Sequence, residues 1–165
     1  MKSEDGVTQS ISISRAELRD FYDDIAAVLD AEDLEAFPAF FTSDALYRVI
    51  SRENFDAGLA HAPIHCRGRA MIEDRVNATR EAALYQPRLL RHFISGVRLA
   101  GEAGDEVHAT ANFLIVESLL EQEPQILMVG QYVDRIVREE GVLRLRERTC
   151  VYDNYHIRTT LVIPV

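Results

Sequence analysis

The chain has few cysteines, no tryptophan, and few prolines or glycines. Its two cysteines, Cys66 and Cys150, lie 84 positions apart, a spacing that fits reduced, buried thiols better than a disulfide framework. With five prolines and eight glycines in 165 residues, the composition is typical of a folded chain rather than a disordered one. One domain with a sizeable core is therefore expected.

Basic charge is also scarce. With 18 lysines and arginines against 27 aspartates and glutamates, the formal net charge is −9, which would repel a nucleic-acid backbone or an anionic membrane surface. No apolar run approaches the roughly 18 residues of a membrane span, and no basic-then-apolar leader begins the sequence. These features favour a cytoplasmic protein that binds neither nucleic acid nor a membrane.

The first half of the sequence has helical periodicity. A capping box that begins at Ser14 and an apolar stripe after it predict a helix over residues 15 to 30. Asp30 is expected to cap a short second helix that runs through Phe41. A third, amphipathic helix is expected from residue 69 to about residue 84.

The second half alternates with a period of two, which is typical of strands. One strand is expected within residues 45 to 54, and four long strands follow residue 91, joined by short turns that make them antiparallel. After a flexible segment over residues 1 to 12, we expect one α+β domain over residues 13 to 165. Its N-terminal helices would pack in a curved, mostly antiparallel sheet, an outline that resembles the cone-shaped nuclear-transport-factor-like fold.

A small group of histidines raises the question of a metal site. His61, His65 and Cys66 are close in sequence, but Pro63 argues against the regular helix that would place the two histidines on one face. We interpret them as loop or core residues. No metal site and no cofactor site is therefore assigned to this chain.

Members of this fold include isomerases and dehydratases, which would need an acid or base in the apolar cone. A buried tyrosine or asparagine that satisfies its hydrogen bonds is commoner than a catalytic one, so no catalytic residue is assigned. The alternative of an acid/base enzyme stays open. Its candidate residues are Tyr22, Asp23, His108, Asn112, Tyr132 and Asp134.

Arginines alternate on the last long strand, at Arg144, Arg146 and Arg148, and are expected to share one face. They pair either with carboxylates of a partner or with carboxylates of this chain, and both interpretations stay open. The sequence then ends on an apolar run that contains Leu161 and Ile163. Such a terminus predicts that the chain's own core or another subunit covers it.

Three long segments carry a resemblance to a known family. They are "CRGRAMIEDRVNATREAALY" from Cys66, "PRLLRHFISGVRL" from Pro87 and "RLRERTCVYDNYHIRTTLVIPV" from Arg144. With them, nearly the whole chain resembles the small (β) subunits of aromatic-ring-hydroxylating dioxygenases, the Rieske-type multicomponent oxygenases. The ending is similar to that of the benzoate, anthranilate, salicylate and terephthalate branch.

This resemblance implies a non-catalytic, structural β subunit. The large α subunit of such an enzyme carries the Rieske [2Fe–2S] cluster, the mononuclear Fe(II) and the substrate pocket, and NADH supplies electrons through a reductase. It also implies an α3β3 hexamer with β–β contacts in a trimer. The residues expected at subunit interfaces are Arg144, Arg146, Arg148, Tyr155, Arg158, Leu161 and Ile163. A stand-alone isomerase or dehydratase, or a binding module without chemistry, are the alternatives.

Overall fold

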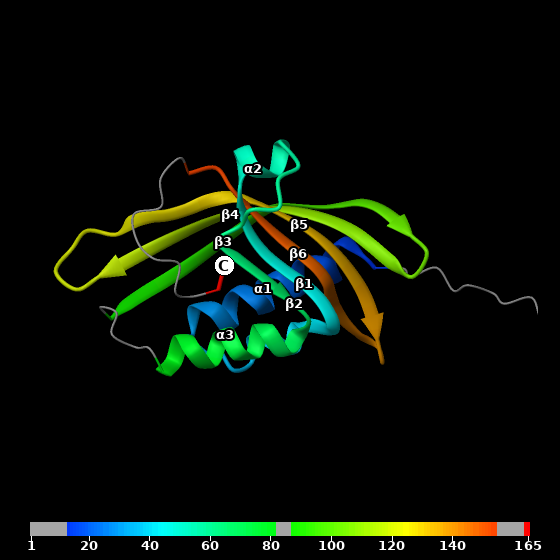
Figure 1. Cartoon of the computed structure of the whole chain (residues 1–165), viewed down its shortest axis with the longest axis horizontal. Coiled ribbons are helices and arrows are strands. Elements are labelled where there is room, and N and C mark those ends of the chain that lie inside the picture. Colours follow the sequence, from blue (N-terminus) through cyan, green and yellow to red (C-terminus); the bar gives the residue numbers. More distant parts are fainter. Residues whose placement is uncertain (1–12, 82–86, 155–163) are drawn as a thin grey trace, which may run out of the picture.

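The computed structural model describes residues 13–81, 87–154 and 164–165. Figure 1 shows long, curved strands that arch over the helices α1 and α3. The elements are α1 (Arg15–Asp30), η1 (Phe37–Phe40), β1 (Phe41–Ser51), α2 (Arg52–Asp56), β2 (Ile64–Arg67), α3 (Arg69–Glu81), β3 (Arg88–Ala103), β4 (Glu106–Leu119), β5 (Gln125–Glu139) and β6 (Val142–Tyr152).

The two long helices lie where their periodicity predicts them. At the start of α1, Ser14 Oγ accepts a hydrogen bond of 3.1 Å from the backbone N–H of Glu17, which satisfies one of the free donors of the first turn. α3 begins at Arg69 as expected and its described part ends at Glu81. The predicted continuation to about residue 84 lies outside the described residues. No helix in the described part of the chain is long and apolar enough to cross a bilayer.

The prediction for the second helix is wrong in two respects. A 3-10 turn of four residues replaces it, and Phe41 opens β1 instead of continuing the helix. Asp30 does not cap this turn, because its carboxylate accepts hydrogen bonds from the backbone N–H of His92, at 3.0 Å, and from the ring of the same residue. Asp30 therefore binds His92 of β3 instead of capping the turn that follows it in the sequence.

The strands form one six-stranded sheet in the order β2-β1-β6-β5-β4-β3. The four long strands β3 to β6 are an antiparallel meander, as predicted. β1 runs parallel to β6 and antiparallel to β2, so the sheet is mostly antiparallel and β3 is one of its edges. The α+β fold class is confirmed, while the single domain over residues 13 to 165 stays a prediction.

The core lies between the concave face of the sheet and the helices. The Phe113 and Tyr132 rings stack with centroids 4.5 Å apart, and Tyr132 stacks in turn on Tyr22 of α1. Val165 is also buried there, and its backbone N–H donates to the Tyr47 hydroxyl at 2.9 Å. This chain's own core therefore covers Val165, whereas residues 155 to 163 lie outside the described residues.

Candidate functional site

A buried ion pair occupies the interior of the cone. Arg148 on β6 and Asp134 on β5 are paired residues on adjacent strands. Their side chains point to the same face, with Arg148 Nη2 2.7 Å from Asp134 Oδ2. The Tyr22 hydroxyl of α1 donates to the same oxygen at 2.7 Å. Because all three side chains are almost fully buried, this cluster links the helix to two central strands in a medium of low dielectric constant.

Aromatic rings surround the guanidinium of this pair. The Cζ atom of Arg148 lies 4.3 Å from the Tyr132 ring centroid and 5.3 Å from that of Tyr22, an arrangement that gives cation–π attraction. Burial alone would lower the pKa of Arg148, but the charge of Asp134 and its hydrogen bonds raise it above its usual value. Burial also raises the pKa of the Tyr22 hydroxyl. The arginine is thus held charged and the tyrosine neutral.

A second pair, His92 and Asp30, lies beside this cluster and was missed by the sequence analysis. His92 Nδ1 is 2.7 Å from Asp30 Oδ1, and the buried Nε2 atom has no hydrogen-bond partner. Burial lowers the pKa of His92, although Asp30 opposes this shift. The available signal was the alternation of Leu90, His92 and Ile94, which places the ring on the inward face of β3.

Three of the six residues considered as acid/base candidates come together in the cone, namely Tyr22, Tyr132 and Asp134. The other three, Asp23, His108 and Asn112, are exposed. His108 Nε2 lies 3.2 Å from Glu106 Oε1 and Asp23 contacts Arg19, so these side chains interact on the outer surface.

The expectation that Arg144, Arg146 and Arg148 share one face is wrong. The register between β5 and β6 shifts at Arg146, which is an extra residue between Leu145 and Glu147. Such a bulge interrupts the alternation of a strand. Arg148 consequently points into the cone, where its carboxylate partner comes from its own chain, while Arg146 points outward.

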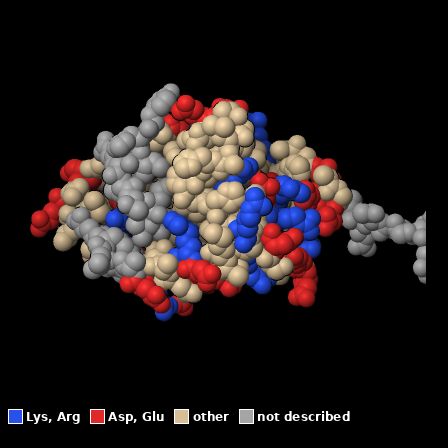
Figure 2. Space-filling model, viewed as in Figure 1, with Lys and Arg blue, Asp and Glu red and all other residues tan. Residues whose placement is uncertain are grey.

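The outward-pointing arginines pair with carboxylates of the same chain. Arg135 makes a bidentate contact with Glu106, with donor–acceptor distances of 2.7 and 2.9 Å. Arg146 contacts Asp105 and Glu106, each at 3.3 Å. Figure 2 shows basic and acidic side chains intermixed towards the end of the molecule that carries the β3–β4 and β5–β6 turns. Of the two interpretations left open by the sequence, pairing with carboxylates of this chain is therefore the one that holds for Arg146.

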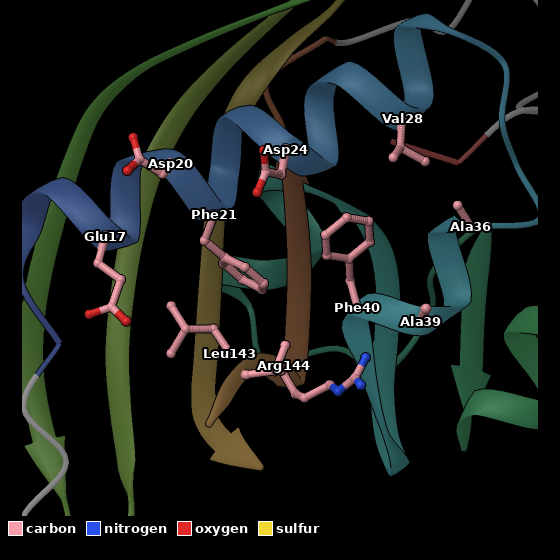
Figure 3. A pocket seen from close by; sticks show the side chains of 11 residues that line it. Glu17, Asp20, Phe21, Asp24, Val28, Ala36, Ala39, Phe40, Leu143 and Arg144 are labelled. Atoms are coloured by element: carbon pink, nitrogen blue, oxygen red, sulfur yellow. The ribbon is translucent and has the colours of Figure 1, made fainter. Parts of the chain in front are cut away.

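Arg144 lies in a different environment, a surface groove of about 440 Å³ between α1, η1 and the start of β6. In Figure 3, the rings of Phe21 from α1 and Phe40 from η1 lie next to each other in the groove, and the Arg144 side chain extends from β6 towards η1. Asp20 and Asp24 of α1 also line it. Within the described part of the chain, Arg144 has no ion-pair partner, so its charge is available to another molecule.

Comparisons with known proteins agree on one family. The SnoaL-like domain family matches residues 11–149. The small subunit of anthranilate 1,2-dioxygenase from Burkholderia cepacia is 31% identical over 137 residues, which cover 83% of this chain and 85% of that subunit. This chain belongs to the β subunits of aromatic-ring-hydroxylating dioxygenases.

Two further relatives of this β subunit agree with that assignment. One is the β 2 subunit of the terephthalate 1,2-dioxygenase terminal oxygenase component from Comamonas sp., 31% identical over 85% of this chain and 91% of the relative. The other is a crystal structure described as a candidate ring-hydroxylating dioxygenase β subunit from Novosphingobium aromaticivorans. It is 37% identical with a TM-score of 0.83, covering 92% of this chain and 96% of that chain.

The described residues of the β subunit do not fit an iron centre. No group of three His, Cys, Asp or Glu side chains in the described ranges could hold a metal ion. His61 lies in the exposed segment before β2, and His65 and Cys66 follow on β2 itself, as loop and core residues. The thiols of Cys66 and Cys150 are free and buried, as predicted. The expectation that this chain binds no metal stays a prediction.

Proposed function

We propose that this chain is the non-catalytic, structural β subunit of a ring-hydroxylating dioxygenase that acts on an aromatic acid. The observation that carries the proposal is its 31% identity with the anthranilate 1,2-dioxygenase small subunit over 83% of this chain. The terephthalate 1,2-dioxygenase subunits, which match over 85% of this chain, favour the same class of substrate. Anthranilate and terephthalate are both aromatic carboxylates.

The cone interior supports a structural role. Two of its charged groups, Arg148 and Asp134, bind each other, and Tyr22 donates to the same carboxylate. A fully paired buried cluster holds the helix on the sheet. Val165 is also buried in this core, where its backbone N–H donates to the Tyr47 hydroxyl.

In this proposal the chemistry belongs to a large α subunit. That subunit would hold the Rieske [2Fe–2S] cluster and the mononuclear Fe(II), and NADH would supply electrons through a reductase. The β subunit would assemble with it in the cytoplasm as an α3β3 hexamer with β–β contacts in a trimer. Tyr155, Arg158, Leu161 and Ile163, expected at interfaces, lie outside the described residues, so their role stays a prediction.

Co-expression with a large α subunit of an aromatic-ring-hydroxylating dioxygenase tests the proposal. We expect the two chains to co-purify, iron to follow the large subunit in elemental analysis, and the complex with its reductase to hydroxylate anthranilate, terephthalate or benzoate in an O2-dependent reaction. The isolated β subunit should be colourless and inactive. Stoichiometric iron in the isolated chain, or failure to bind the large subunit, would contradict the proposal.

One observation favours the alternative of an isomerase or dehydratase. His92 is a buried histidine oriented by Asp30 through Nδ1, and its Nε2 atom has no partner. Such a dyad could move a proton if a ligand reached the cone. The isolated chain would then turn over a small cyclic ketone or alcohol, and His92→Asn would abolish this turnover while the chain remained folded. Turnover by the isolated chain would favour this alternative over the structural role.

A further inference from the structure

The groove beside α1 carries an unbalanced negative charge. Glu17 on its rim is neutralised by Arg138, whose Nη2 lies 2.6 Å from Glu17 Oε1. Asp20 and Asp24, one helical turn apart on α1, have no ion-pair partner among the described residues. These two carboxylates outnumber the single cation of the groove, Arg144. The site therefore favours an apolar side chain accompanied by a basic one.

The walls of the groove supply the apolar part of the site. The Phe21 and Phe40 rings make an edge-to-face contact with centroids 5.9 Å apart, and Leu143 closes the groove from β6. A space of about 440 Å³ between such walls accepts one or two large apolar side chains. Figure 3 shows these three side chains pointing into one space from three different elements.

The edge strand β3 carries a surface of the opposite kind. Leu89, Arg91 and Phe93 alternate on its outer face, and their exposed fractions are 67% for Leu89, 57% for Phe93 and 69% for the side chain of Arg91. Arg91 makes one ion-pair contact in the described structure, a 3.6 Å approach to Asp30. Because the Arg91 side chain is mostly in solvent, a pair of this length contributes little, and the guanidinium can exchange partners.

The apolar surface continues beyond the edge strand. Phe93 pairs with Leu114 on β4, and Leu114 pairs with Val129 on β5, whose exposed fraction is 41%. A contiguous apolar patch on the outside of a sheet marks an interaction site more often than a free surface. We call Leu89, Arg91 and Phe93 the β3 strip.

We propose that the β3 strip of one β subunit binds the α1 groove of the next β subunit. Leu89 and Phe93 enter the groove and pack against the Phe21 and Phe40 rings, and Arg91 exchanges Asp30 for the carboxylates at Asp20 and Asp24. The contact is head-to-tail, because each copy contributes two different surfaces, and such contacts form a ring when the rotation between successive copies closes. This inference rests on the β–β contacts of the proposed function and identifies the surfaces that make them.

A second copy is favoured over the large subunit as the occupant of the groove. Both complementary surfaces, one basic and apolar and the other acidic and apolar, are present on this chain. An acidic chain with a net charge of −9 also needs local pairs of opposite sign if its copies are to approach each other. Arg91 opposite Asp24 supplies such a pair.

Charge reversal in the full-length chain tests the contact. Arg91→Glu and Asp24→Arg should each weaken self-association by at least about tenfold in sedimentation equilibrium, because like charges then face each other. The double variant Arg91→Glu/Asp24→Arg should recover most of the lost affinity. Arg98→Glu on β3 and Asp23→Arg on α1 are matched controls, since both positions are exposed and neither is part of the strip or the groove.

Several results would overturn the inference. A wild-type chain that is monomeric at micromolar concentration, single variants that associate normally, or a double variant without recovery would each do so. Loss of large-subunit retention with unchanged self-association would assign the groove to the large subunit instead. Co-purification of the large subunit with the wild-type chain is a separate measurement. Failure of the contact between β subunits is therefore distinguishable from failure of the proposed function.

Discussion

Arg148 and Asp134 form an ion pair inside the cone, with Nη2 2.7 Å from Oδ2 and side-chain exposures of 1% and 0%. Two charges removed from water in this way are stable only as a pair. The pair joins adjacent strands, and through Tyr22 it also holds α1 against them.

We expect Arg148→Met to lower the free energy of unfolding by about 3–5 kcal/mol, because the Asp134 carboxylate then lies buried without a counter-ion. Asp134→Leu should cost a similar amount, and the double variant should cost much less than the sum of the two. Urea unfolding measures all three. Additive losses would show that the two side chains do not stabilise each other.

Gly130 gives a prediction about close packing between β5 and β6. A Cβ atom at this position would lie 2.0 Å from the carbonyl oxygen of Val151 and 2.9 Å from Cζ of Phe113. Gly130→Ala should therefore destabilise the fold by about 1–3 kcal/mol or more, since the backbones of two strands must separate. The matched control is Gly101→Ala, where nothing lies within 4 Å of the added atom. Equal melting temperatures for the two variants would contradict this packing.

His92 gives a prediction about pH. Burial lowers the pKa of this side chain below that of the unfolded chain. The histidine is neutral in both states above about pH 6.5, so its contribution is complete there. As the pH falls below about 6.5, the unfolded state binds a proton first, and stability falls by up to about 1.4 kcal/mol per pH unit.

The experiment compares the wild-type chain with His92→Asn by urea unfolding between pH 5 and pH 8. The variant should lose less stability than the wild type towards acid pH. His61→Asn, at an exposed position, is the control and should follow the wild type. A stability difference that stays constant with pH would contradict a shifted pKa at His92.

The buried end of the chain gives a fourth prediction. Removing residues 161 to 165 deletes Val165, a residue that is 2% exposed, together with its backbone contacts to Tyr47. Full burial of a valine side chain is worth about 1.5–3 kcal/mol, so the truncated chain should melt several degrees lower or fail to assemble.

Two controls accompany the truncation. Tyr47→Phe removes only the hydroxyl that accepts from Val165 and should cost about 1 kcal/mol. Substitutions within the first ten residues should change the melting temperature little. An unchanged melting temperature after truncation, with full assembly, would show that the end of the chain contributes nothing to the fold.

Local sequence patterns determined most of the elements of this β subunit. The capping box at Ser14, the helical stripe of α1 and the period of two along β3 to β6 specify type and approximate length, because they depend on neighbours within one turn or one strand. Short turns then force the antiparallel meander. The resemblance carried by three long segments added the family, which the comparisons confirm.

Tertiary structure alone decided where the charged side chains point and what they meet. The extra residue at Arg146 separates Arg148 from Arg144, and no periodicity in the sequence reveals such a bulge. Asp30 binds His92, 62 positions away, instead of a local helix end, because the backbone N–H and the ring of His92 on the edge strand β3 offer it two hydrogen-bond partners. The parallel pairing of β1 with β6 likewise joins segments about 100 positions apart, and only the assembled sheet brings them together.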